Sequence, residues 1–96
     1  MGARLRCRIE RDREATRLDV AGSLDRGNEI DLVRAFWRAA DRPGREVVVD
    51  LSRVTYFDSI ALTTVLGLER IAERQRGCAV DVRGIETAAW SLTGLG

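Results

Sequence analysis

The sequence predicts an α/β fold in which helices pack on a mixed four-stranded sheet, with the elements in the order β-β-α-β-α-β-α. Three observations predict this class. Apolar and polar residues alternate at period two over residues 5–20, which is typical of half-buried strands. The run Val47–Val49 is β-branched throughout and suits a central strand that is covered on both faces. Residues 46–83 follow a strand–helix–strand pattern, which implies a parallel strand pair with a right-handed crossover.

The first two elements are predicted to be the strands of a hairpin. Leu5, Cys7 and Ile9 alternate with charged residues in the first strand, and the same period continues over residues 16–20 in the second. A polar turn over residues 11–14 separates them, so the two strands are expected to pair with each other.

A helix is predicted to follow the glycine-containing break at residues 22–27. Asn28 is a favourable N-cap residue, and acidic residues in the first turn suit the helix dipole. The turn residues 42–45 end the helix. The apolar residues expected to face the core are Ile30, Val33, Phe36, Trp37 and Ala40.

The central strand is predicted over residues 47–51, and residues 52–57 are interpreted as a connection. A second helix is predicted to begin at Asp58 and Ser59 and to end at Gly77, a C′ glycine. The apolar stripe of this helix is expected to consist of Ala61, Val65, Leu68 and Ala72.

The chain is then predicted to return to the sheet. Cys78, Val80 and Val82 alternate with Ala79, Asp81 and Arg83 and indicate a fourth strand. Residues 86–92 indicate a short last helix. Cys7 and Cys78 both fall at inward-facing strand positions, so we expect two reduced thiols that pack as small hydrophobic groups.

The composition excludes several kinds of site. The chain has sixteen positive and fifteen negative residues, a formal net charge of +1 and no His, and every positive residue is Arg. Zinc sites built on His and Cys, and His-based catalysis, are therefore excluded, and no phosphate-binding glycine motif occurs. We expect one domain over residues 1–96 that is not an enzyme, holds no cofactor or metal and binds no nucleic acid. The N-terminus has no apolar signal region and no segment is suited to membrane insertion, so a cytoplasmic protein is expected.

Residues that could carry chemistry are concentrated between Asp50 and Ser59. A buried strand leads here into a helix that begins with an acid and a hydroxyl, and sites in open α/β sheets collect at this edge. One interpretation is that Asp58 or Ser59 is only the N-cap of the helix. The other is that Ser59 presents an exposed hydroxyl, on which a phosphate would be stabilised by free backbone N–H groups and the helix dipole.

These segments resemble a known family. Val47–Ser52, Val54–Ser59 and Leu62–Gly77 are similar to the corresponding segments of STAS domains of the anti-sigma factor antagonist family. Gly22-Ser23-Leu24-Asp25 resembles the Gly-x-Leu-Asp turn of that family, and Leu92-Thr93-Gly94-Leu95 resembles the start of its closing helix. The resemblance covers nearly the whole chain and implies a single STAS-like domain.

The resemblance also implies a function. Such a domain binds an anti-sigma factor, which then releases its sigma factor. In this family the anti-sigma factor is an ATP-dependent serine kinase, and it dissociates the complex by phosphorylating the domain. A metal-dependent phosphatase removes the phosphate and restores the binding form. By match to the motif, Ser59 is the phosphoacceptor. The implied partner-binding residues are Asp25, Asp58, Ser59, Ile60 and Ala61.

The chain departs from the family pattern directly after Ser59. The family usually has Asp-Ser-(Ser/Thr)-Gly-Leu, whereas this chain has Ile60 in place of the second hydroxyl and Ala61 in place of the glycine. An alternative function is therefore a STAS module that is not phosphorylated. Such a module would be a subunit of a larger complex, at the cytoplasmic face of a transporter or in a stress-signalling assembly.

Overall fold

The computed structural model describes residues 4–85. It contains β1 (Arg6–Arg11), β2 (Ala15–Leu24), α1 (Glu29–Ala39), β3 (Glu46–Phe57), α2 (Ser59–Arg76) and β4 (Val80–Arg83). The four strands form one sheet in the order β1-β2-β3-β4, in which β1 is antiparallel to β2 and the other pairs are parallel. The prediction of a mixed four-stranded sheet is confirmed. The helix predicted over residues 86–92 lies outside the described residues.

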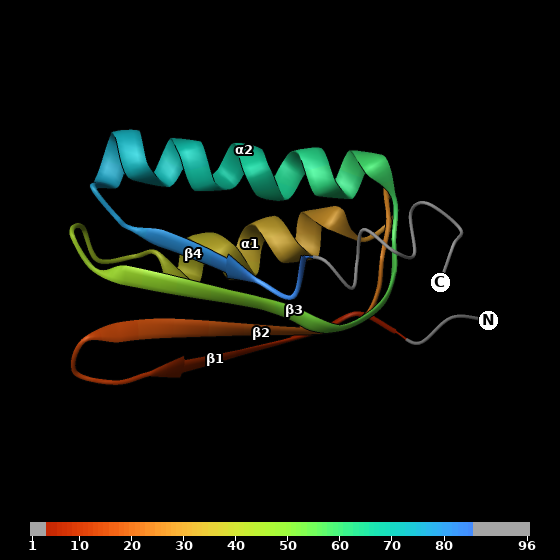
Figure 1. Cartoon of the computed structure of the whole chain (residues 1–96), viewed down its shortest axis with the longest axis horizontal. Helices are drawn as coiled ribbons and strands as arrows, with labels where there is room; N and C mark the ends of the chain where they lie inside the picture. The colour runs from red at the N-terminus through yellow and green to blue at the C-terminus, as the bar shows by residue number, and fades with distance from the viewer. Residues whose placement is uncertain (1–3, 86–96) are drawn as a thin grey trace.

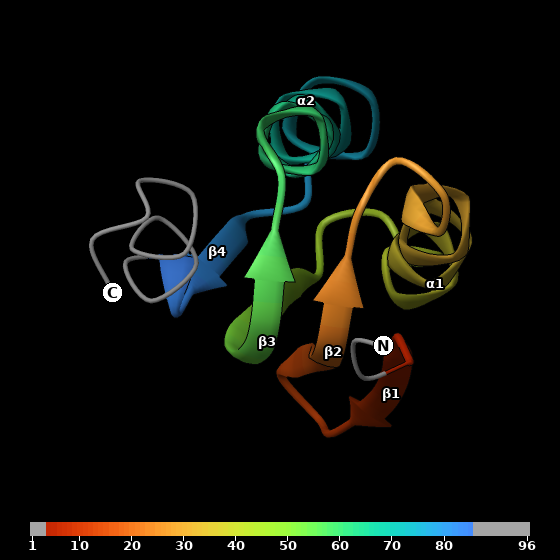
Figure 2. The same ribbon diagram turned by 90° about the vertical axis from the view of Figure 1, so that its right-hand side faces the viewer.

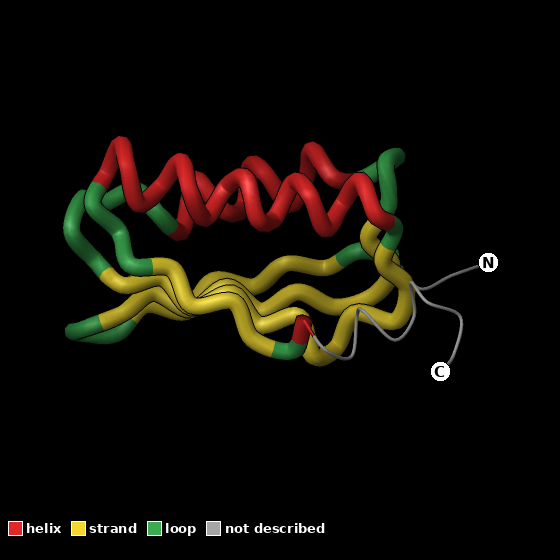
Figure 3. Tube along the Cα trace, turned by 45° about the horizontal axis from the view of Figure 1, so that its top comes forward, coloured by secondary structure: helices red, strands yellow, loops and turns green. Residues whose placement is uncertain are grey.

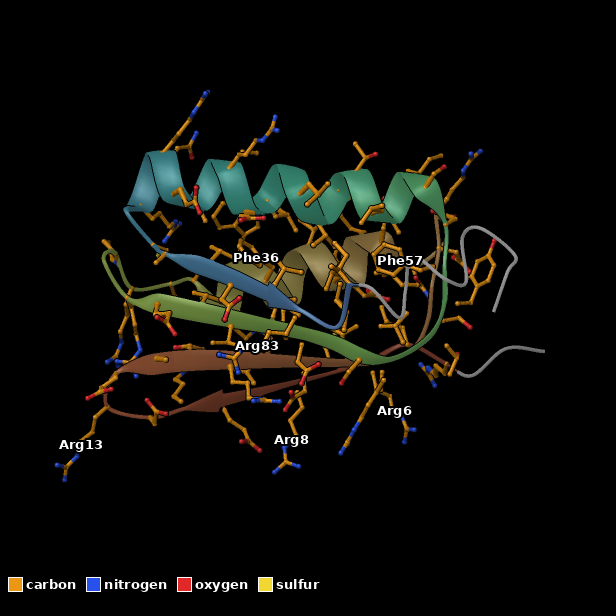
Figure 4. All side chains as sticks on the ribbon, viewed as in Figure 1. Arg6, Arg8, Arg13, Phe36, Phe57 and Arg83 are labelled. Carbon is orange, nitrogen blue, oxygen red and sulfur yellow. The ribbon has the colours of Figure 1, made fainter. Side chains whose placement is uncertain are left out.

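Both helices of residues 4–85, α1 and α2, lie on one face of the sheet, and no described element covers the other, which we call the open face (Figures 1 and 3). The core fills the space between the helices and the sheet, and the side chains of Phe36 and Phe57 lie in this space (Figure 4). Arg6 and Arg8 project from the opposite, open face of the sheet. The side chains of Leu18, Val47 and Leu51 are fully buried in this core. Burial of one such side chain contributes about 1.5–3 kcal/mol, so this apolar layer is the main source of stability.

The hairpin has the predicted burial, whereas the expectation that the central strand is covered on both faces is wrong for residues 4–85, because α1 and α2 lie on the same face of the sheet. β1 pairs with β2 in the register Arg6↔Ala21 to Arg11↔Thr16, and its apolar side chains are half-buried on the helix side. In β3, Val47 and Val49 face the helices, and Val48 is also buried although it lies on the opposite side. Val48 pairs with residues of both neighbouring strands, which is why a β-branched run is favoured at this central position.

The predicted connection over residues 52–57 is wrong, because β3 continues through it to Phe57. The pairing with β2 has register shifts between Asp19 and Ala21 and again between Gly22 and Ser23, and at each shift β3 holds one extra residue. The buried side chains of this half of the strand are therefore three residues apart, at Leu51, Val54 and Phe57. The period-two pattern is lost although the strand is not.

The core-facing stripe of α1 differs from the prediction in part. Phe36 and Ala40 are buried as expected, but Ile30 is 52% exposed and Leu32 is buried in its place. The helix turns Leu32, Ala35, Phe36 and Ala39 toward the core. Trp37 is only half-buried and packs edge-on against Phe36 at a centroid distance of 5.2 Å, with Arg76 over its ring at 5.4 Å.

The second helix follows the prediction closely. Its buried residues are Ala61, Val65, Leu68 and Ala72, and Gly77 ends it in the left-handed conformation at φ 63°. Cys78 is buried but precedes β4, so it is not part of the strand as predicted. Both cysteines are free thiols, as expected. Neither helix within residues 4–85 is long and apolar enough to span a membrane.

Candidate functional site at the carboxyl edge of the sheet

The candidate site forms where β2 and β3 end side by side. The two strands are paired up to Leu24↔Phe57, so the loop that leads to α1 and the turn that leads to α2 begin at adjacent points (Figure 2). The backbone N–H of Asp58 donates to the Leu24 carbonyl at 3.4 Å, which continues the contact beyond the strands. Residues 25–28 and 58–61 therefore form one surface, although more than thirty positions separate them in the sequence.

Asp58 connects the two halves of this surface. One carboxylate oxygen, Oδ1, accepts a hydrogen bond from the Ala61 N–H at 2.8 Å and so caps α2. The other oxygen, Oδ2, accepts from the Arg26 N–H in the opposite loop at 3.1 Å. The N-cap interpretation of Asp58 is confirmed, and the same carboxylate also binds the second loop, which the sequence analysis did not predict.

Asp25 and Asn28 hold the shape of the loop before α1. The Asp25 carboxylate accepts from the Gly27 N–H at 2.8 Å. The Asn28 side chain accepts from the Asp25 N–H at 3.0 Å and donates to the Ser23 carbonyl at 2.8 Å. Asn28 was expected to cap α1 through its side chain, but that side chain makes no capping hydrogen bond. It closes the turn instead, since Asn side chains compete effectively for nearby backbone groups.

Ser59 is the first residue of α2, and its side chain is exposed. Of the first N–H groups of the helix, that of Ala61 binds the Asp58 carboxylate and that of Leu62 binds the Asp58 carbonyl at 3.1 Å. Within residues 4–85, nothing accepts from the N–H groups of Ser59 and Ile60. The positive end of the helix dipole and these donors lie beside the Ser59 hydroxyl, an arrangement that suits an anion.

The two residues after Ser59 differ in their accessibility. Ile60 is 39% exposed, whereas the methyl group of Ala61 is fully buried beneath the first turn. Of the predicted partner-binding residues, Asp25 and Asp58 are half-buried and Ser59 and Ile60 are exposed. The side chain of Ala61 is not accessible to a partner, and its backbone N–H donates to the Asp58 carboxylate that caps α2.

Exposed apolar side chains lie on the elements that meet at this edge. Ile30 in the first turn of α1 is 52% exposed, and Tyr56 near the end of β3 is 50% exposed. The first turn of α1 and the second turn of α2 are joined by a hydrogen bond from the Thr64 hydroxyl to the Glu29 carboxylate at 2.9 Å. The sequence analysis assigned Ile30 to the core and did not identify Tyr56.

Asp50 and Ser52 do not belong to this site. Asp58 is eight positions beyond Asp50 along β3 and its end, on the order of 25 Å at a rise of ~3.3 Å per residue. Asp50 lies on the open face of the sheet, where its carboxylate accepts from the Ser52 N–H at 2.9 Å and pairs with Arg17. Hydrogen bonds from Ser52 and the charge of Arg17 lower the pKa of Asp50 below its usual range. The role of this motif is to link strands.

No metal site is evident in the part of the chain that the structure describes, since no three His, Cys, Asp or Glu side chains there are arranged to hold an ion. The acidic residues of the candidate site bind backbone N–H groups of their own loops. What the site offers is an exposed serine hydroxyl on a helix N-terminus, held in place by a rigid acidic turn.

Known proteins resemble this chain in sequence and in fold. A family model described as "Mlab, STAS domain" matches residues 7–93. The STAS domain of an antisigma-factor antagonist from Rhodobacter sphaeroides has a TM-score of 0.67 and 23% sequence identity, over 92% of this chain and 92% of that chain. An anti-sigma factor antagonist from Mycobacterium paratuberculosis has a TM-score of 0.71 and 26% identity, over 96% of this chain and 80% of that chain. No curated protein matches the sequence.

Proposed function

This chain belongs to the STAS domain family, and on that basis we propose that it is an anti-sigma factor antagonist whose binding is switched off by phosphorylation of Ser59. In this proposal the unphosphorylated domain binds an anti-sigma factor, and the ATP-dependent serine kinase activity of that partner modifies Ser59. A metal-dependent phosphatase restores the binding form. The domain is the regulated binding partner and catalyses neither step.

The observation that carries the proposal is the exposure of the Ser59 hydroxyl at the first position of α2. A kinase can reach this hydroxyl without unfolding the helix. The neighbouring Asp58 carboxylate holds the first turn of α2 and the loop at Arg26 in fixed positions. A partner would therefore meet a preformed surface, which lowers the entropic cost of binding.

A phosphate on Ser59 would act on the partner and leave the fold intact. It adds about −1.5 to −2 charges at pH 7 and would be accommodated by the free N–H groups at the start of α2. The surface already carries the carboxylates of Asp25 and Asp58, so phosphorylation makes it strongly negative. A partner whose docking surface is complementary to the unmodified site would then lose about 1–3 kcal/mol of binding free energy, or roughly 5- to 150-fold in affinity.

The test is the affinity of Ser59 variants for the ATP-binding anti-sigma factors of the same cell, measured with purified proteins. Ser59→Ala should bind like the parent, and Ser59→Asp should bind at least ~5-fold more weakly because it adds one of the negative charges of a phosphate. Thr63→Asp is the matched control, because Thr63 is exposed on α2 one turn beyond Ser59. Equal binding by Ser59→Asp and the parent would refute the switch.

A second function is favoured by the residues that follow Ser59. Ile60 presents an exposed apolar side chain where the family usually has a hydroxyl, and Ala61 is buried where the family usually has a glycine. An exposed isoleucine suits a permanent interface better than a surface that must release its partner. The chain would then be a constitutive subunit of a larger complex, and binding would fall in Ile60→Asp but stay unchanged in both Ser59 variants.

A further inference from the structure

A second accessible surface lies on the other side of α1, between this helix and β1. A groove of about 610 Å³ runs here; its floor and rim are formed by Arg4, Leu5, Cys7, Ile9, Arg11, Asp31, Arg34, Ala35 and Arg38. α1 lies above the β1–β2 side of the sheet, and α2 lies above β3 (Figure 2). The groove is therefore separated from the Ser59 surface by the body of α1.

The floor of the groove is apolar and its side is an open sheet edge. Leu5, Cys7 and Ile9 are only half-buried, because α1 does not extend over the full width of β1. β1 is the terminal strand of the sheet, and no other strand within residues 4–85 pairs with its outer side. About half of its N–H and C=O groups therefore point outward along six residues, which is a template for one more strand.

The rim of the groove is strongly basic. Among the described residues that line it, four are arginines and one, Asp31, is acidic. Arg11 is already engaged, since it pairs with Asp41 at 3.0 Å and donates to the Arg38 carbonyl at 2.9 Å, and so closes one end of the groove. Arg4, Arg34 and Arg38 are exposed and form no ion pair with any described residue.

The open face of the sheet is also basic at β1. Arg6 and Arg8 point away from the helices on this face, and of these two only Arg8 forms an ion pair, with Glu10 at 3.0 Å. A strand added beside β1 would thus have one row of side chains against the apolar floor and the other row opposite these arginines. In an ideal occupant, apolar residues that face α1 alternate with acidic residues on the open face of the sheet, opposite Arg6 and Arg8.

We propose that this groove is a docking surface for an extended, acidic segment of a partner protein, which adds to the sheet beside β1 as a fifth strand. Main-chain hydrogen bonds to β1 would supply affinity, and the arginines would select an acidic sequence. A second copy of this chain is a poor occupant, because it would bring the same arginine-rich rim against itself. A single-stranded nucleic acid is less suited, because the described residues of the floor offer aliphatic groups and a thiol and no aromatic side chain on which a base could stack.

The experiment is fluorescence anisotropy with a labelled heptapeptide of alternating glutamate and valine. The full chain should bind this peptide, and Arg6→Glu combined with Arg8→Glu, which reverses the charge opposite its glutamates, should weaken binding by at least ~10-fold. The control combines Arg70→Glu with Arg74→Glu, an exposed arginine pair on α2 whose replacement changes the net charge by the same amount, and should change affinity by less than ~2-fold. Circular dichroism verifies that both double variants are folded.

Two further probes separate strand addition from charge attraction alone. A peptide of the same sequence that is N-methylated at every peptide nitrogen has no N–H group to donate to β1 and should lose binding. Equal binding by the methylated peptide, or equal effects of the two double variants, would overturn the proposal. Tighter binding of a single-stranded oligonucleotide than of the peptide would overturn it too, as would a dimer of the parent chain that dissociates when the peptide binds. Ser59→Asp should bind the peptide like the parent, so this proposal and the Ser59 switch fail independently.

Discussion

Replacement of Asp58 by alanine tests whether one carboxylate holds the candidate site together. The substitution removes the cap on the Ala61 N–H and the link to the Arg26 N–H. Loss of an N-cap costs about 1 kcal/mol, and loss of the second hydrogen bond, which is more exposed, costs about as much again. We therefore expect the free energy of unfolding to fall by about 2 kcal/mol. For a domain of this size, that corresponds to a decrease of about 8–16 °C in Tm.

The assay is urea unfolding followed by far-ultraviolet circular dichroism, with Asp58→Asn and Asp12→Ala as companions. Asparagine keeps one acceptor oxygen and can still cap Ala61, so it should lose only about 1 kcal/mol. Asp12 accepts from the N–H groups of Glu14 and Ala15, both at 2.8 Å, in the turn at the opposite end of β2. Asp12→Ala removes both of these hydrogen bonds and should also lower the free energy of unfolding.

The two alanine variants should differ in partner binding. Asp58→Ala loosens the surface next to Ser59 and should weaken binding of the anti-sigma factor, whereas Asp12→Ala should not change it. A loss of less than ~0.5 kcal/mol in Asp58→Ala would refute the reasoning, since it would mean that neither hydrogen bond is significant in solution. An asparagine variant as unstable as the alanine variant would refute the assignment of the cap.

Three further stability predictions can be measured by the same urea titration. Gly67→Ala should raise the unfolding free energy by about 0.5–1 kcal/mol, because Gly67 is in the middle of α2 and a Cβ there would contact nothing within 4 Å; a decrease would contradict this. Gly84→Ala should lower the unfolding free energy by at least ~2 kcal/mol, because φ is +78° and the new Cβ would lie 2.4 Å from the Ser52 nitrogen. Gly77→Ala should lower it by only about 1 kcal/mol, because φ is +63° but nothing lies within 4 Å of the new Cβ. Asp50 has a lowered pKa in the folded state, so its contribution is present above its ordinary pKa and is lost as the pH falls through the lowered value. Asp50→Asn should therefore flatten the acid side of the stability profile, and an unchanged acid side would exclude this group as a cause.

The elements that the sequence predicted correctly are those with an uninterrupted period. The stripe of α2 from Ala61 to Ala72 recurs every three or four residues, and the run Val47–Val49 has no polar interruption. Both patterns arise from local geometry, so each can be recognised without knowledge of the rest of the chain. The end of α2 was equally accessible, because Gly77 is one of the few residues that favour a left-handed C-cap.

The elements predicted incorrectly depend on neighbouring strands or helices. The second half of β3 has two extra residues relative to β2, and only the pairing with β2 makes these visible as bulges. In α1, Ile30 and Leu32 are both apolar residues near the start of the helix, and the docking of the helix against β2 and β1 decides which of them is buried. A single sequence does not contain that orientation.

The candidate site was predicted in its parts and not in its assembly. The start of an apolar helix indicated that Asp58 or Ser59 is its cap, and the structure shows that the cap is Asp58. Asp25 and Ser59 were singled out by resemblance to a family. The contact between Arg26 and Asp58 could not be predicted, because it joins two loops that meet only after β2 and β3 pair. The role of Ser59 itself stays a prediction.

Phosphopeptide mass spectrometry of the protein from its native cell shows whether Ser59 is phosphorylated. Lysis in a chelator prevents a metal-dependent phosphatase from removing the phosphate, and cleavage after Arg53 and Arg70 places Ser59 on one peptide with three threonines. The account predicts a single phosphate on Ser59 under at least one growth or stress condition. An unmodified peptide under every condition, or a phosphate on a threonine alone, would contradict it.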